Sequence, residues 1–266
     1  MRHFTMVAAG FAVAAAGTAA IAAEAPTSMQ YQTGLTVGQA DTGSSHRTGS
    51  SICYSSLGLG TSPFENFQGG GFSHGSTPVL DDILMNKPAG TRIDEITFSV
   101  VSFNDDGTTS GTSTTPGGDV TTTANVALFN ANPDGTPNFA APKGSVAVTG
   151  LVISSFTVNL FTIDVKDLNI VKKDEMMWAG IFFTDTTGPA NADGSSLNDG
   201  MGQGIFQQST KGFSDDLFSF GGGLNWFGGF PANPWANFGW EFRSVPTPGA
   251  MAIFGLAGVA ATRRRR

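Results

Sequence analysis

Short stretches of alternating apolar and polar residues run along the middle of the chain. In the clearest of them, residues 93–103, the side chains of Ile96, Phe98 and Val100 share one parity. Alternation with a period of two is typical of a β-strand that buries one face. The parity of the apolar positions then changes, which predicts a β-bulge at Val100–Val101.

Similar stretches recur with turn signals between them and without any amphipathic helical pattern. Residues 176–183 are almost wholly apolar, which predicts a strand that is buried on both faces. Residues 40–75 are rich in Gly and Ser and are interpreted as an edge hairpin with long loops. The pattern therefore predicts an all-β fold, an antiparallel β-sandwich of jelly-roll type. The other predicted strands are 126–129, 146–153, 156–163 and 238–242, with weaker candidates at 79–84 and 213–220.

The first 22 residues have the order of a secretory signal peptide. Arg2 begins a short polar start, and residues 6–21 form an apolar stretch. Ala20-Ile21-Ala22 then offers the small-x-small pattern of a cleavage site. We expect residues 1–22 to form a signal helix that is removed, and residues 23–244 to form the β-sandwich domain.

The last 22 residues, 245–266, combine three elements in a fixed order. A proline motif comes first, an uncharged apolar run over 250–262 follows, and four arginines end the chain. Thirteen residues give about 20 Å of helix, which is short against a hydrocarbon core of about 30 Å. The arginines favour the cytoplasmic side of a membrane. The motif residues are Val245, Pro246, Thr247, Pro248 and Gly249, and the cytoplasmic-side anchor is Arg263, Arg264, Arg265 and Arg266.

This arrangement resembles the PEP-CTERM sorting signal of exported bacterial proteins. The resemblance implies an exosortase-type membrane enzyme that processes the tail, and a cell-surface or extracellular destination associated with exopolysaccharide and biofilm. The family usually has Glu where this chain has Thr247, which leaves the identity of the processing enzyme open. A simple tail anchor is the alternative, with the body held at a membrane through a short apolar segment.

Charge and cysteine content narrow the function classes. The whole chain has a net charge of −7, and residues 23–244 hold nine basic and all 21 acidic residues, a net charge of −12. Such a body is a poor partner for nucleic acid or for an anionic membrane surface. Cys53 is the only cysteine, so no disulfide framework is possible, and it is interpreted as a small buried apolar residue.

No catalytic constellation is convincing, and we predict that the protein is not an enzyme. Residues 71–75 match the G-x-S-x-G nucleophile elbow, but neither a helix nor a later histidine follows them. The segment is therefore interpreted as a glycine-rich loop. Asp94, Glu95 and Glu241 are carboxylates on predicted strands, and we expect them on a solvated face rather than paired for glycoside hydrolysis.

The candidates for a metal site are few. His46 and His74, even with Asp81 and Asp82, lack the three or four closely spaced ligands that zinc favours, so both histidines are expected at the surface. Acidic loops suit Ca²⁺ better, because that ion takes oxygen ligands from carboxylates and loop carbonyls. We predict no cofactor, and the weak calcium candidates are Asp105, Asp106 and Asp119, with Asp193, Asp199, Asp215 and Asp216 as further loop carboxylates.

Aromatic residues in a Gly- and Pro-rich segment leave a second function open. Planar rings can stack on sugars, as in β-sandwich glycan binders, although such rings also cap the end of a core. We predict a structural or interaction protein of the cell surface or extracellular matrix, with a carbohydrate-binding module as the alternative. The rings in question are Trp226, Phe227, Phe230 and Trp235, whereas Trp178 and Trp240 are expected in the core.

Overall fold

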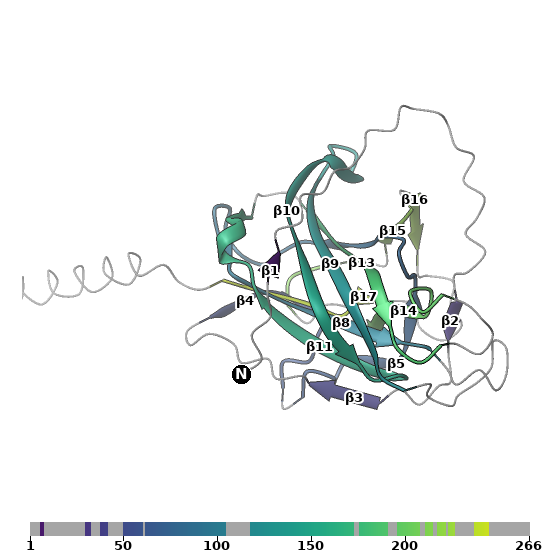
Figure 1. Ribbon diagram of the computed structural model, residues 1–266. Coiled ribbons are helices and arrows are strands. Elements are labelled where there is room, and N and C mark those ends of the chain that lie inside the picture. Colours follow the sequence, from purple (N-terminus) through teal and green to yellow (C-terminus); the bar gives the residue numbers. More distant parts are fainter. Residues whose placement is uncertain are drawn as a thin grey trace, which may run out of the picture.

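The computed structural model describes an all-β body (Figure 1). It describes residues 50–60, 62–104, 118–172, 176–190, 196–207, 211–214, 217–221, 223–226 and 237–244, and three short strands before residue 50. These three are β1 (Met6–Val7), β2 (Gln30–Gln32) and β3 (Gly38–Asp41). Within this part of the chain there is no α-helix, and the prediction of an all-β fold is confirmed.

One sheet is wholly antiparallel and has seven strands. Its order is β1-β10-β9-β13-β6-β15-β16. Strand β1 lies inside the predicted signal peptide, and Met6 pairs there with Val148 of β10. The strands after β1 are β10 (Pro137–Ile153), β9 (Val120–Ala131), β13 (Met177–Thr187), β6 (Val79–Ile83), β15 (Leu217–Phe220) and β16 (Gly223–Trp226).

The other large sheet has nine strands and contains the last described strand of the chain. Its main path is β2-β5-β14-β8-β11-β3, in which only the pair of β11 and β3 is parallel. Strand β18 pairs with both β8 and β4, and β17 pairs with β14. The strands are β4 (Ser51–Ser55), β5 (Phe67–Ser73), β8 (Glu95–Ser102), β11 (Thr157–Asp164), β14 (Met201–Phe206), β17 (Asn237–Phe238) and β18 (Trp240–Ser244).

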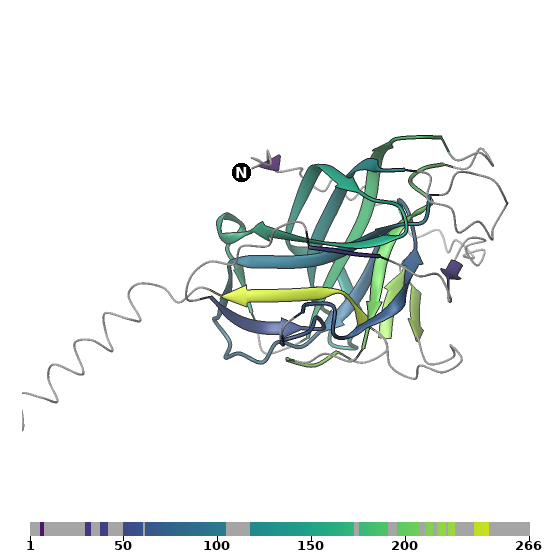
Figure 2. The same ribbon diagram turned by 90° about the horizontal axis from the view of Figure 1, so that it is seen from below.

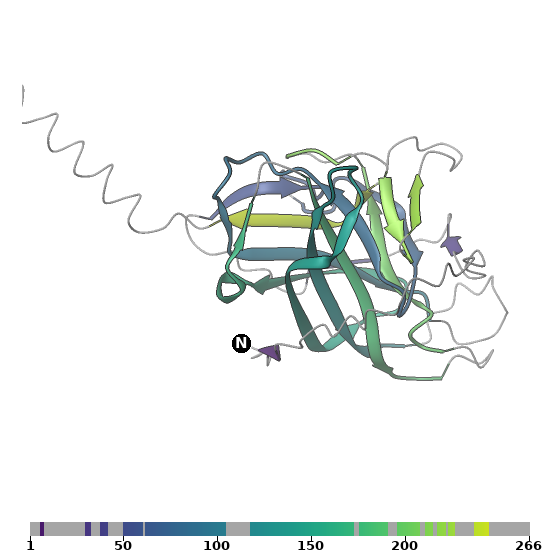
Figure 3. The same ribbon diagram turned by 90° about the horizontal axis from the view of Figure 1, so that it is seen from above.

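The two large sheets face each other, and their strands cross (Figures 2 and 3). Strands β8 and β18 run across β9 and β13 in these views. A small sheet of β7 (Arg92–Ile93) and β12 (Ile170–Val171) and a 3₁₀ turn at Lys166–Leu168 complete the described elements.

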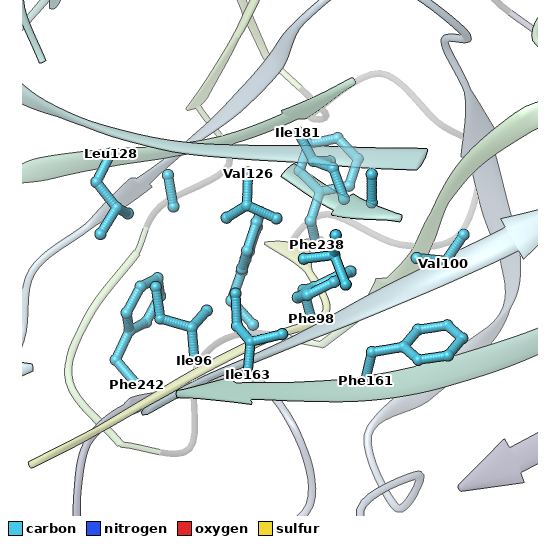
Figure 4. Close-up of a cluster of buried hydrophobic side chains, with 14 of the residues drawn as sticks. Ile96, Phe98, Val100, Val126, Leu128, Phe161, Ile163, Ile181, Phe238 and Phe242 are labelled. Carbon is cyan, nitrogen blue, oxygen red and sulfur yellow. The ribbon is translucent and has the colours of Figure 1, made fainter. Parts of the chain in front are cut away.

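The main core fills the space between the sheets. Side chains of β9 and β13 point toward those of β8, β11 and β18 (Figure 4). Because successive residues of a strand point to opposite faces, every second residue of each strand enters this core. Those labelled in the figure are Ile96, Phe98, Val100, Val126, Leu128, Phe161, Ile163, Ile181, Phe238 and Phe242.

Two smaller apolar clusters lie outside the main core, one around Val101 and the other around Trp178. The first of them shows that the predicted bulge at Val100–Val101 is absent. Val100 belongs to the main core, whereas Val101 packs on the other face of β8 with Val158 and Leu160. The pairing of β8 with β11 continues without a register shift from Val101 to Glu95. The bulge prediction was therefore wrong: the parity changes because this strand is buried on both faces.

Strand β13 is also covered on both faces, as its sequence predicted. Ile181 and Phe183 enter the main core, and Trp178 packs on the opposite face with Leu80 and Phe129. Trp178 and Trp240 are both fully buried, which confirms their assignment to the core. Residues 40–75 differ from the expectation of an edge hairpin with long loops, because β4 and β5 pair within the nine-stranded sheet.

Gly202 of β14 allows an unusually close approach of β5, and we expect Gly202→Ala to lower the free energy of unfolding by about 1–3 kcal/mol. An added Cβ would overlap the carbonyl oxygen of Phe72, which is backbone and cannot rotate away. Gly223→Ala is the matched control, because its Cβ would meet nothing nearer than the Phe220 carbonyl oxygen at 3.6 Å. Urea unfolding of both variants checks the prediction, and equal losses would contradict it.

Candidate functional site

A cavity of about 290 Å³ lies on the outer face of the nine-stranded sheet. Its polar lining comes from Thr97 on β8 and from Glu241 and Arg243 on β18, which alternate with the core residues of the same strands. Residues 57–63 contribute much of the remaining wall. The apolar lining residues are Ile52, Leu57, Leu59, Pro63 and Leu160.

A buried ion pair forms the polar part of this cavity. The Arg243 Nε donates to Glu241 Oε1 at 2.5 Å, and the side chains are 18% and 5% exposed. Residues two apart on a strand share a face, so the local sequence brings this pair together. Beside it, the hydroxyls of Thr97 and Thr162 are 2.7 Å apart. A charged pair, a hydroxyl and aliphatic walls suit a small ligand with both polar and apolar parts.

The carboxylates expected on a solvated face are buried instead, which corrects that prediction. Asp94 is fully buried and pairs with Arg92 at 2.6 Å, while Glu95 and Glu241 are each only 4% exposed. Among the described lining residues of the cavity, Glu241 is the one carboxylate. In the sequence, Glu241 and Arg243 alternate with Trp240 and Phe242. The same alternation is typical of a strand with one solvated face, so it does not by itself indicate a buried ion pair.

A second hollow is apolar and lies on the outer face of the seven-stranded sheet. Its volume is about 210 Å³, and it is lined by strands β6, β9, β10 and β13. It adjoins the small cluster around Trp178. The lining residues are Pro78, Leu80, Ala127, Phe129, Phe139, Gly180, Ile181 and Phe182.

The segment that matches the nucleophile elbow is not a loop. Gly71 and Ser73 belong to β5, and the Ser73 hydroxyl donates to the Asp199 carbonyl. An added Cβ on Gly71 would lie 2.9 Å from the Gln203 carbonyl oxygen, so this glycine serves close strand packing. The strand geometry differs from the sharp strand-to-helix turn of an elbow.

His74 is buried, which corrects the prediction of a surface residue. It is 7% exposed and its ring lies 5.4 Å from that of Phe183. The Nδ1 atom lies 3.1 Å from the Thr77 carbonyl oxygen, so it carries the proton, while the buried Nε2 has no hydrogen-bond partner. Burial lowers the pKa of His74 from 6.5 to about 4, against a smaller opposing effect of the Thr77 carbonyl.

The lowered pKa of His74 predicts a loss of stability at acid pH. Below about pH 6.5 the unfolded chain binds a proton at this residue, whereas the folded protein does not until about pH 4. The free energy of unfolding should therefore fall over this range by about 3 kcal/mol from His74 alone. In His74→Asn, whose amide can still donate to Thr77, this part of the pH dependence should disappear. Urea unfolding across this pH range tests it, and identical profiles for both proteins would contradict it.

Of the predicted metal-binding candidates, the structure describes some and leaves others outside the described residues. Asp119 is exposed just before β9, while Asp105, Asp106 and His46 lie outside the described residues. In the part of the chain that the structure describes, no group of three His, Cys, Asp or Glu side chains gathers as a metal site.

Several other predicted site residues lie outside the part of the chain that the structure describes. Trp226 ends β16, but its side chain and residues 227–236 are outside the described part, as is the tail 245–266. Cys53 is fully buried as expected, and burial raises the pKa of its thiol. No described helix has the length and apolarity needed to cross a bilayer.

The comparisons with known proteins found no match. No family model matches the chain, and neither a curated protein nor a solved structure matches it.

Proposed function

We propose that this chain is an exported protein of the cell surface or extracellular matrix, with a structural or interaction role and a jelly-roll-like sandwich body. The observation that carries the proposal is the three-part C-terminus: the motif 245–249, the apolar run 250–262 and the arginines 263–266. In this proposal, an exosortase-type membrane enzyme recognises the tail while the arginines hold its end on the cytoplasmic side.

The properties of the body support an extracellular role. Residues 23–244 carry a net charge of −12 and a single cysteine, which is compatible with an oxidising exterior. The described strands bury their aromatic residues in one large core and two smaller clusters. We propose exopolysaccharide as the material with which such a body associates.

Intact mass of the protein from membrane, surface and medium fractions of its native cells tests the proposal. We expect a mature product that begins near Ala23 and ends near Val245–Pro246. A product that keeps Arg266 and stays in the membrane fraction would contradict processing and would favour a permanent tail anchor.

Variants of the motif prolines sharpen this test. Replacing Pro246 and Pro248 with alanine should stop processing and leave the unprocessed chain in the membrane fraction. Pro133→Ala is the control, since Pro133 is an exposed proline in the turn between β9 and β10. Processing that is unchanged in the double variant would contradict recognition of this motif.

Glycan binding is the second candidate function. Strand β16 is the last strand of its sheet, and Trp226 ends it, so the aromatic segment 226–235 begins at a sheet edge. We propose that rings from this segment stack on sugar units of the exopolysaccharide. Combined Trp226→Ala and Trp235→Ala should abolish binding on a glycan array. The control Phe213→Ala removes a 46% exposed ring elsewhere and should leave binding unchanged.

A further inference from the structure

The guanidinium of Arg243 keeps donors that no described contact uses. Its Nε donates to Glu241 Oε1 at 2.5 Å, and its Nη1 donates to the Ser50 hydroxyl at 3.4 Å. Neither of these contacts involves Nη2, and the side chain, which is 18% exposed, lines the cavity of about 290 Å³. A guanidinium has five N–H groups in a planar fork, so donors of Arg243 remain for a ligand in this cavity.

Thr97 offers a second polar group on the sheet side of the cavity. Its hydroxyl lies 2.7 Å from the hydroxyl of Thr162. A hydroxyl has one proton and two acceptor positions, so this contact leaves Thr97 able to form another hydrogen bond. Glu241 pairs with Thr97 in the register of β18 and β8, so hydroxyl, carboxylate and guanidinium are neighbours on one face of the sheet.

The charges around the cavity disfavour an anionic ligand. Glu95 lies opposite Arg243 in the pairing of β8 with β18, and it is only 4% exposed. Together with Glu241 it places two carboxylates beside one guanidinium, in a body whose net charge is −12. A ligand carboxylate or phosphate would be repelled by these groups, and a ligand cation would be repelled by the guanidinium. The cavity therefore favours a neutral ligand that forms hydrogen bonds.

The apolar part of the lining sets the shape of the other side of the ligand. Leucine and proline side chains from residues 57–63 form one wall, and Ile52 of β4 and Leu160 of β11 contribute to the others. The volume lies at the lower end of the range for small-molecule sites, which suits a molecule of one or two small rings. A pyranose ring has hydroxyls around its edge and C–H groups on its faces, and thus matches both parts of the lining.

We propose that this cavity binds one neutral sugar unit. Two adjacent hydroxyls of the sugar bind Arg243 and Thr97, and a C–H face of the ring packs on the leucines of the lining. Each sugar hydroxyl both donates and accepts, which suits a site that places a guanidinium beside a threonine hydroxyl. This site is separate from the aromatic segment 226–235, and its binding is independent of processing of the tail.

Saturation-transfer NMR of the full chain with single sugars tests the proposal. The protein is held in a detergent without a sugar head group, because a glycoside detergent would compete for the cavity. The neutral probes are glucose, galactose, mannose, rhamnose and N-acetylglucosamine, and the charged counterparts are glucuronate and galacturonate. We expect saturation transfer to at least one neutral sugar and weaker transfer to both uronates at equal concentration. A protein that binds none of the neutral sugars, or that binds the uronates more tightly, would overturn the proposal.

Matched arginine variants locate the site. Arg243→Lys keeps a cation beside Glu241 but removes the planar fork, so affinity for the bound sugar should fall by about 10-fold or more. Arg92→Lys is the control, because Arg92 also pairs with a buried carboxylate, that of Asp94 at 2.6 Å, but is not among the described lining residues of the cavity. Urea unfolding checks that both variants are folded. Equal affinities of the two folded variants would place the sugar elsewhere.

A second pair of variants changes the rim of the cavity without touching its charges. Leu59 lines the cavity and is 47% exposed, so Leu59→Ala should leave the fold intact and weaken sugar binding several-fold. Leu224→Ala removes a 44% exposed leucine from β16 of the other sheet and should leave binding unchanged. If Leu59→Ala bound the sugar normally while combined Trp226→Ala and Trp235→Ala abolished binding, the aromatic segment would be the site and the cavity proposal would be wrong.

Discussion

Replacing Trp240 with alanine is expected to lower the free energy of unfolding by about 3–5 kcal/mol, the range for truncation of a large buried aromatic residue. Trp240 is fully buried, with its ring stacked on Phe242 at 5.9 Å and tilted against Phe98 at 6.1 Å. It lies on β18, which pairs with β8 on one side and β4 on the other. The cavity left by alanine would therefore open at the centre of the nine-stranded sheet, where backbone pairing on both sides limits collapse.

A second substitution at Trp240 separates the contribution of ring packing to stability from that of the polar indole N–H. The indole Nε1 of Trp240 is buried and has no hydrogen-bond partner. Trp240→Phe removes this N–H and keeps a ring, so it should destabilise the protein much less than Trp240→Ala does. Leu224→Ala, at a side chain that is 44% exposed, should have little effect. Urea unfolding measures all three, and equal losses for the Phe and Ala variants would refute the packing argument.

The strand pattern predicted most of the fold because alternation reports a buried face. The predicted strands 93–103, 156–163 and 176–183 overlap β8 (Glu95–Ser102), β11 (Thr157–Asp164) and β13 (Met177–Thr187) to within one or two residues at each end, apart from the longer C-terminal end of β13. The pattern failed where a strand is covered on both faces. At Leu160–Phe161, as at Val100–Val101, adjacent residues are both buried: Leu160 enters the cluster on the outer face and Phe161 enters the main core.

The sequence pattern did not predict the small apolar cluster on the outer face of the nine-stranded sheet, around Val101, Val158 and Leu160. It forms because residues 57–67 fold back over β8 and β11, so that Leu57 and Phe64 cover Val101 and Val158. The sequence of this segment does not predict the contact, because a segment rich in Gly and Ser has the composition of a solvated loop. The same covering buries Glu241 and part of Arg243, which is why the expectation of a solvated face for Glu241 was wrong.

The buried contact of Ser214 with Asp81, Asp82 and Asn237 was equally out of reach of local pattern. Ser214 is 132 residues from Asp82 and 23 from Asn237, and only the register of three strands brings them together. A pair of adjacent aspartates in an otherwise apolar strand, Val79–Ile83, was the one signal in the sequence. Adjacent residues point to opposite faces, so one of the two had to enter the core and needed a polar environment there.

The second large loss of stability is expected when the guanidinium of Arg243 is removed from the cavity. Arg243→Met should lower the free energy of unfolding by about 3–5 kcal/mol, because it leaves the buried carboxylate of Glu241 without this cation. The double variant Glu241→Gln with Arg243→Met carries no charge at either position, so it should regain much of that loss.

The chain offers a matched control for this pair in Lys166 and Asp164. Their side chains are 43% and 38% exposed at a separation of 3.2 Å, so Lys166→Met should cost about 0–1 kcal/mol. Urea unfolding of the three variants therefore measures what burial adds to an ion pair of the same charge. If Lys166→Met cost as much as Arg243→Met, burial would not be the cause. If the double variant stayed as unstable as Arg243→Met, packing of the arginine stem against the cavity wall would dominate over its charge.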